Sequence, residues 1–263
     1  MTKGLPTTQD KLAALRALTP ARIFLARAGL ALTTGANLEF QLDHAEARDA
    51  VHERLEVETL TEILRSRGLD VLSLASAAPD RRTYLLRPDL GRKLDQRSLV
   101  PLARLAGDYD IAFVIADGLS ARAISSHAVA LLDQALPPFR RCSWKLAPIV
   151  VVEQGRVAIG DEIGEILGAR LVAVLIGERP GLSSPDSLGV YLTFAPRVGR
   201  MDAERNCLSN IRRGGTSYSE GAQRLFHLCS EARRRKLTGV ELKDETPLVK
   251  SDDQLVQLDD LQK

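Results

Sequence analysis

Segments in the second half of the chain have the composition of a ligand-binding edge, and Glu178 in one of them could contact a large polar ligand. Val157, Glu178 and Cys207 each lie in or beside a segment rich in glycine that follows a short apolar run. A carboxylate such as that of Glu178 can accept hydrogen bonds from amide or hydroxyl groups, whereas Val157 offers packing and backbone groups. Open α/β sheets bind ligands at the carboxyl ends of their strands, where the loops carry no ladder hydrogen bonds. We therefore expect a ligand-binding edge here.

Each of these motifs also has a purely structural interpretation. Glu178 could form an ion pair with Arg179 or Arg197. Cys207 could be a small buried apolar residue, and no histidine near it in the sequence supports a Cys–His nucleophile. The segment Asp117–Ser120, which ends a predicted strand and opens a predicted helix, could contact a ligand or could serve as a turn with a helix N-cap. The sequence leaves these alternatives open.

Composition narrows the class of protein. The chain has 263 residues, a net charge of +2, 44% hydrophobic residues and 27% charged residues. Such values are ordinary for a globular protein, and the weak net charge argues against a dedicated nucleic-acid binder. Three cysteines without a CxxC pair or zinc spacing indicate a reducing compartment, and the apolar runs are too short to cross a bilayer. We expect a cytoplasmic protein that contacts neither membrane nor nucleic acid.

Several common binding motifs are missing from the sequence. It contains no Gly-x-Gly-x-x-Gly and no phosphate-loop signature, and its four histidines share no metal-like spacing. It also lacks the Asp-x-His-x-x-Gly motif that supplies an axial histidine in one common cobalamin-binding module; the nearest segment, Asp43-His44, has neither spacer nor glycine. Gly160, Gly164 and Gly168 recur at every fourth position, which suits close helix–strand packing. We expect no metal ligands.

The elements that must position these residues alternate between strand and helix after Asp110. Apolar runs predict strands, amphipathic periodicity predicts helices, and this order predicts an α/β fold with a parallel sheet and right-handed crossovers. The predicted strands are Ile111–Ala116, Leu146–Val152, Leu171–Ile176 and Val190–Phe194, and the predicted helices are Ala121–Leu136, closed by Pro137-Pro138, Asp161–Leu167 and Ser219–Lys236.

The first part of the chain is predicted to be mainly helical. The expected helices are Gln9–Leu18, Glu39–Glu53, Val57–Arg67 and Leu94–Leu105, with Pro101 placed near a first turn, and a hairpin is expected between Asp70–Ala75 and Thr83–Arg87. Residues 241–263 form an acidic polar tail that we expect to be disordered. We therefore divide the chain into a helical region with a short hairpin (1–107), a ligand-contacting domain (108–240) and the tail (241–263).

Several motifs in order closely resemble the family of ethanolamine ammonia-lyase small (light) subunits. They are Tyr84–Arg92, Asp117–Ser120, Gly155–Val157, Asp161–Gly168, Gly177–Leu182 and Cys207–Thr216. The resemblance spans about residues 13–239. It implies a Rossmann-like, mostly parallel sheet with helices on both faces, preceded by a smaller helical region.

The resemblance also implies a function. Members of the family are subunits of an adenosylcobalamin-dependent lyase that converts ethanolamine to acetaldehyde and ammonia by a radical mechanism. A large subunit holds the substrate and most catalytic residues, so we expect no catalytic residue in this chain. The resemblance also implies that the two subunits form a higher-order hetero-oligomer. The family's cobalamin contacts fall on Val157, Glu178 and Cys207. The cofactor keeps its own benzimidazole on cobalt, so an axial histidine is not required, and some relatives enter a bacterial microcompartment.

Two other functions compete with this interpretation. A free-standing Rossmann-like oxidoreductase would bind a nicotinamide cofactor, against which the missing dinucleotide fingerprint counts. A purely structural subunit would make no cofactor contact. Glu178 discriminates between the cobalamin-binding and the structural role, because only the former predicts that its removal weakens cobalamin affinity.

Overall fold

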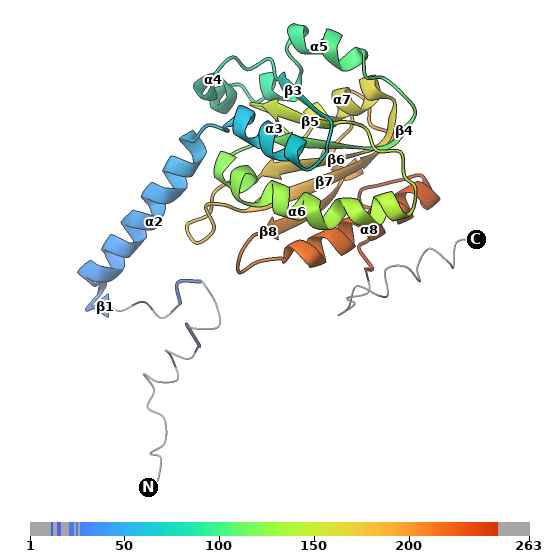
Figure 1. Cartoon of the computed structure of the whole chain (residues 1–263). Coiled ribbons are helices and arrows are strands. Elements are labelled where there is room, and N and C mark those ends of the chain that lie inside the picture. Colours follow the sequence, from blue (N-terminus) through green and yellow to red (C-terminus); the bar gives the residue numbers. More distant parts are fainter. Residues whose placement is uncertain (1–11, 13–14, 17–20, 24, 26, 247–263) are drawn as a thin grey trace.

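A six-stranded sheet lies at the centre of the computed structural model, which describes residues 12, 15–16, 21–23, 25 and 27–246 (Figure 1). The strand order is β3-β5-β4-β6-β7-β8. The first four strands in this order are parallel to one another. Strand β7 pairs antiparallel with β6, and β8 pairs antiparallel with β7. The strands are β3 (Val71–Ala75), β4 (Tyr109–Ala116), β5 (Ile149–Glu153), β6 (Ala169–Gly177), β7 (Leu188–Phe194) and β8 (Asn206–Ile211).

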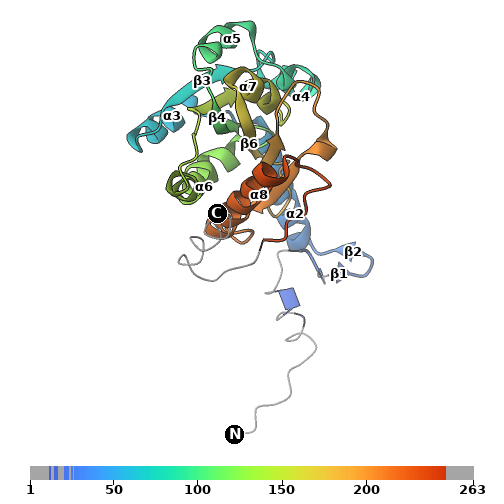
Figure 2. The same ribbon diagram turned by 90° about the vertical axis from the view of Figure 1, so that its right-hand side faces the viewer.

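Helices cover both faces of this sheet (Figures 1 and 2). One face carries α3 (Val57–Ser66), α6 (Ala121–Arg141) and α8 (Tyr218–Arg235), and the other carries α5 (Gln96–Ala103) and α7 (Ile159–Leu167). Alternate residues of β6 enter the two cores, so that Leu171, Ala173 and Leu175 face α6 while Val172, Val174 and Ile176 face α7. A strand buried on both faces must be apolar throughout, which is why the apolar run Leu171–Ile176 could be recognised as a strand from the sequence. The predicted α/β fold with a mostly parallel sheet is confirmed.

The glycine repeat packs α7 against the sheet. A Cβ at Gly160 would collide with the side chain of Val174, and one at Gly164 would collide with Pro196. Gly168 ends the helix in the left-handed conformation with φ of 73°, where glycine is unstrained. The close-packing interpretation of the repeat is confirmed.

The prediction that Pro137-Pro138 closes the preceding helix is wrong. Helix α6 continues through both prolines to Arg141. Each proline removes one backbone hydrogen bond, but the extra turn buries Phe139 and places it in an aromatic cluster. Its ring lies 5.0–5.5 Å, centroid to centroid, from the rings of Phe113, Trp144 and Phe226. Edge-to-face contacts of this kind stabilise the longer helix. A prediction from the two prolines alone cannot include these contacts with distant residues.

The predicted hairpin is also wrong. Strand β3 pairs in parallel with β5, and the segment expected as its partner forms helix α4 (Arg81–Leu86). Asp80 is the N-cap of this helix, because its carboxylate accepts hydrogen bonds from the Thr83 amide at 2.8 Å and from the Thr83 hydroxyl at 3.1 Å. The turn chemistry therefore begins a helix. The chain before residue 108 thus contributes strand β3 to the central sheet and helices α3 and α5 to the helix layers on its two faces.

Pro101 lies deeper in its helix than predicted. Helix α5 begins after Asp95, whose side chain accepts a hydrogen bond from the Arg97 amide, and Pro101 stands in its second turn. The cost is limited because the helix ends two residues later, at Ala103, so few backbone bonds depend on the interrupted turn.

Helix α2 (Thr34–His52) projects away from the sheet, and a short β1–β2 hairpin (Arg27–Ala28 and Ala31–Leu32) precedes it (Figures 1 and 2). Thr33 caps the helix, which therefore starts five residues before the predicted Glu39. Ala50 is its one buried residue. The predicted helix Gln9–Leu18 lies mostly, and the predicted tail from 247 onward entirely, outside the described residues. Among the described helices, none has the length and apolar character needed to cross a membrane.

Candidate functional site

Two of the three predicted residues lie at the carboxyl edge of the parallel strands. Val157 stands between β5 and α7, and Glu178 follows β6 directly. Strands β5 and β6 both run parallel to β4, which lies between them in the sheet. The loops that carry Val157 and Glu178 therefore emerge at the same edge. This is the edge at which parallel α/β sheets bind ligands.

Cys207 has a different location from the one its motif suggested. The segment Asn206–Ile211, for which no strand was predicted, forms strand β8, and Cys207 pairs with Tyr191 of β7, which in turn pairs with Val174 of β6. Cys207 therefore lies within the outermost strand of the sheet and not in a loop at the carboxyl ends of the parallel strands. In β8 Leu208 and Ile211 are buried while Cys207, Ser209 and Asn210 are exposed, as in a strand with one solvated face.

All three predicted residues share the face of the sheet that carries α7. Val157 and Tyr191 both pack against the apolar cluster beneath α7, and the Glu178 side chain lies beside Gly189, on the same side of β7 as Tyr191. Helix α7 lies over β4 and β6, and helices α6 and α8, which contact β7 and β8, pack on the opposite face. We call the surface formed by Glu178, Gly189, Tyr191 and Cys207 the open face.

Glu178 is held by neutral donors and not by an arginine. Its Oε2 accepts a hydrogen bond from the Ser187 hydroxyl and a second, at 3.2 Å, from the Asn210 backbone amide. Among the described residues it forms no ion pair with Arg179 or Arg197. The ion-pair alternative is therefore not supported, and the carboxylate keeps its charge available to a ligand.

Cys207 and Tyr191 form a polar patch beside this carboxylate. Partial removal from water raises the pKa of the Cys207 thiol, and the negative charge of Glu178 acts in the same direction. Burial and the neighbouring Cys207 and Glu178 likewise raise the pKa of Tyr191. Both groups thus stay protonated at neutral pH, so Cys207, which is exposed, forms part of a neutral wall and is not an activated nucleophile.

The loop that carries Val157 is anchored by Asp117. This carboxylate is 1% exposed and accepts a hydrogen bond from the Gly155 amide at 3.0 Å. Its other oxygen lies 3.4 Å from the guanidinium of Arg81, which is also buried. Burial raises the pKa of Asp117 to about 6, so the side chain is mostly ionised at neutral pH and pairs with Arg81. Asp117 is therefore a structural anchor for the site.

Ser120 confirms the capping interpretation of its motif. Its hydroxyl accepts a hydrogen bond from the Ala123 amide and donates one of 2.8 Å to the carbonyl of Pro185. The N-cap of α6 therefore also holds the segment between Glu178 and β7. His127, about two helical turns further on, is buried between Tyr218 and Asp186, as expected for a packed histidine.

Tyr84 is a site-supporting residue for which the sequence suggested no role. Its ring is fully buried between the guanidinium groups of Arg81 and Arg156, which lie 4.8 and 4.1 Å from the ring centroid. Its hydroxyl donates to the Gly155 carbonyl at 3.1 Å, and the Tyr84 carbonyl accepts from Arg156. The partners are 71 residues apart or more in most of these contacts, so no local spacing could reveal them.

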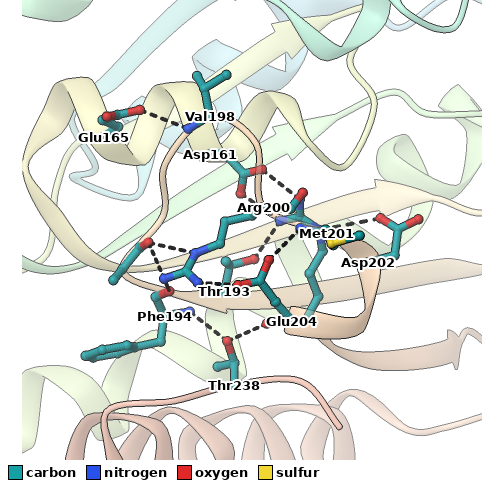
Figure 3. Close-up of polar contacts among 12 residues, drawn as sticks. Asp161, Glu165, Thr193, Phe194, Val198, Arg200, Met201, Asp202, Glu204 and Thr238 are labelled. Atoms are coloured by element: carbon teal, nitrogen blue, oxygen red, sulfur yellow. Dashed lines mark hydrogen bonds and ion pairs between the residues drawn. The ribbon is translucent and has the colours of Figure 1, made fainter.

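A second buried ion pair joins α7 to the segment that leads into β8 (Figure 3). Arg205 donates to both oxygens of Asp161, at 2.6 and 2.7 Å, and both side chains are at most 2% exposed. Arg205 also donates to the Thr193 hydroxyl and to the Arg200 carbonyl. Because Val157 precedes α7 and Cys207 follows Arg205, this pair fixes two sides of the open face relative to each other.

Comparisons with known proteins agree with the motifs. A family model described as "Ethanolamine ammonia-lyase light chain (EutC)" matches residues 9–243. The chain is 56% identical over 256 residues to an ethanolamine ammonia-lyase small subunit of Azotobacter vinelandii, covering 96% of this chain and 95% of that protein. A relative of the same name from Xanthomonas campestris pv. campestris is 56% identical over 255 residues, with 94% of each chain covered. Another, from Pseudomonas putida, is 53% identical over 249 residues, with 93% and 92% covered.

Proposed function

This chain belongs to the ethanolamine ammonia-lyase light-chain family, and from that premise we propose that it binds adenosylcobalamin on its open face, at an interface with a large subunit. One observation carries the proposal. Val157, Glu178 and Cys207 come from separate segments, yet they share one face of the sheet: Glu178 and Cys207 lie on the open face, on the side away from α6 and α8, and Val157 lies beside α7 on the same side. A ligand and a second polypeptide would together cover this surface.

The residues of the open face fit a corrinoid. The periphery of a corrinoid carries amide groups, and Glu178 offers an acceptor for their N–H donors while forming no ion pair with a described residue. Gly189 has no side chain, which leaves room for the Glu178 carboxylate against the strand. Tyr191 and Cys207 add neutral polar groups. The proposal assigns no axial ligand of cobalt to this chain.

The proposed role of the chain in the reaction is binding and exclusion of water. The cofactor, when bound, supplies the radical chemistry that converts ethanolamine to acetaldehyde and ammonia. Glu178 accepts a hydrogen bond from the ligand, Val157 and Cys207 form the adjoining wall, and Tyr191 contributes to the surface beneath it. None of them acts as a general acid or base in this proposal. The large subunit provides the substrate site and the other half of the cofactor site.

Replacing Glu178 with alanine tests the proposed cofactor contact. We expect the affinity of the complex with the large subunit for cobalamin to fall by about 1–3 kcal/mol, because a hydrogen bond to a charged acceptor is lost. Titration of cyanocobalamin, followed by its visible absorbance, measures this change. Glu62→Ala is the matched control, since this exposed carboxylate lies on α3, across the sheet.

Two results would contradict the proposal. If Glu178→Ala and wild type bound cobalamin equally in an intact complex, the chain would have a structural role only. The division of labour is tested separately by assaying ammonia release from ethanolamine with adenosylcobalamin present. We expect release from the complex and none from this chain alone; release by the isolated chain would show that the large subunit is not required.

A further inference from the structure

The two oxygens of the Glu178 carboxylate have different surroundings. Oε2 accepts hydrogen bonds from the Ser187 hydroxyl and from the Asn210 amide, whereas Oε1 has no donor among the described residues. We propose that Ser187, Gly189 and Asn210 are positioning residues that fix this carboxylate so that Oε1 alone meets the ligand. The inference rests on the proposed function, which concerns the same site.

The Asn210 amide is available because β8 contains a bulge. The pairing of β7 with β8 shifts between Leu188, which pairs with Ile211, and Val190, which pairs with Leu208, so two residues of β8 stand opposite Gly189. Asn210 has φ of 60°, the left-handed conformation that asparagine tolerates better than most residues. A bulge frees one residue from the ladder and redirects its groups. Here the freed amide donates to Glu178 at 3.2 Å.

The bulge is itself held in place by its surroundings. The Asn210 carbonyl accepts a hydrogen bond of 2.8 Å from the Thr216 amide, and its side-chain oxygen accepts one of 2.8 Å from Arg212. Gly215 allows this approach, since a Cβ there would collide with the Asn210 carbonyl. The glycine-rich segment after β8 thus supports the donor that holds Glu178 and makes no ligand contact in this proposal.

Gly189 provides the space in which the carboxylate lies. A Cβ built at this position would stand 2.9 Å from Oε1 and 3.2 Å from Cγ of Glu178, closer than ordinary van der Waals contact. An alanine would therefore displace the carboxylate, which is the far end of a flexible side chain. The backbone of Gly189 does not require glycine, because its φ is not among the positive values. We therefore expect Gly189→Ala to disturb the carboxylate much more than the fold.

The arrangement limits the class of ligand group that Glu178 can bind. With Oε2 already occupied by two donors, the carboxylate cannot accept the paired donors of a guanidinium in the bidentate manner. A single neutral donor, such as the N–H of a primary amide, matches the one free oxygen. The inferred partner of Oε1 is therefore an amide of the cofactor's periphery and not a bidentate guanidinium.

Titration of cyanocobalamin into complexes of the large subunit with four variants tests this inference. The variants are Glu178→Ala, Gly189→Ala, Ser187→Ala and the double variant Glu178→Ala/Gly189→Ala. We expect Gly189→Ala to weaken binding about tenfold, and Ser187→Ala somewhat less, with little change in melting temperature. We expect the double variant to bind no more weakly than Glu178→Ala, because Gly189 acts only through the carboxylate. Gly221→Ala, in α8 on the opposite face, is the control.

The outcomes separate this inference from the proposed function. If Glu178→Ala weakens binding while Gly189→Ala and Ser187→Ala bind like wild type, the positioning inference is wrong and the cofactor site remains. Additive losses in the double variant would also overturn it, since Gly189 would then act independently of Glu178. If Glu178→Ala itself binds like wild type, the proposed function fails. Should Gly189→Ala not assemble, Ser187→Ala, which only removes a hydroxyl, decides the question.

Discussion

Replacing Arg205 with alanine is expected to lower the free energy of unfolding by about 3–5 kcal/mol, because a buried charge at Asp161 would lose its partner. The two side chains are at most 2% exposed and share two hydrogen bonds of 2.6 and 2.7 Å. Thr193 and the Arg200 carbonyl would also lose a donor (Figure 3). Urea-induced unfolding of the full-length chain, followed by far-ultraviolet circular dichroism, measures the difference.

The matched control for Arg205 is a surface ion pair. The Arg97 side chain is 91% exposed beside Asp95, and Arg97→Ala should cost less than about 1 kcal/mol, as is usual for exposed pairs. An equal loss for Arg97→Ala and Arg205→Ala would contradict the prediction. The double variant Asp161→Leu/Arg205→Met should recover much of the stability, because an apolar pair of similar size leaves no buried charge.

Asp117→Ala should have a comparable effect at the other side of the site. It leaves the buried guanidinium of Arg81 without its carboxylate and the Gly155 amide without its acceptor. A cost of about 3–5 kcal/mol is expected for breaking one partner out of a buried pair. The same denaturant titration measures it. Because Gly155 leads into Val157, we also expect greater backbone mobility of this loop, measurable as faster amide hydrogen exchange.

Two comparisons make the Asp117 prediction specific. Asp117→Asn keeps an oxygen for the Gly155 amide and should be less destabilising than Asp117→Ala, since it loses only the charge. Asp133→Ala removes a carboxylate from an exposed pair with Arg67 and should cost less than about 1 kcal/mol. A loss for Asp117→Ala as small as that for Asp133→Ala would mean that the buried pair contributes little to stability.

Helix ends and strand partners show where local reasoning fails. The prolines after Leu136 signal a helix end, yet Phe139 gains an aromatic cluster by continuing the helix. The turn residues before Thr83 suggested a hairpin, but β3 finds a parallel partner in β5, far along the chain. In both cases a distant contact outweighs the local preference, and the sequence pattern contains no information about that contact.

The sequence by itself determined the α/β fold and pointed to the Val157, Glu178 and Cys207 segments. Apolar runs mark buried strands and glycine-rich segments mark their ends, because burial on both faces and sharp turns impose strict demands on residue type. Only the tertiary structure decided that Cys207 stands in a strand, that Asn210 forms a bulge opposite Gly189, and that the Glu178 carboxylate has one free oxygen. The physical reason is that register and strand order depend on pairings between distant segments, whereas periodicity reports only what each segment buries.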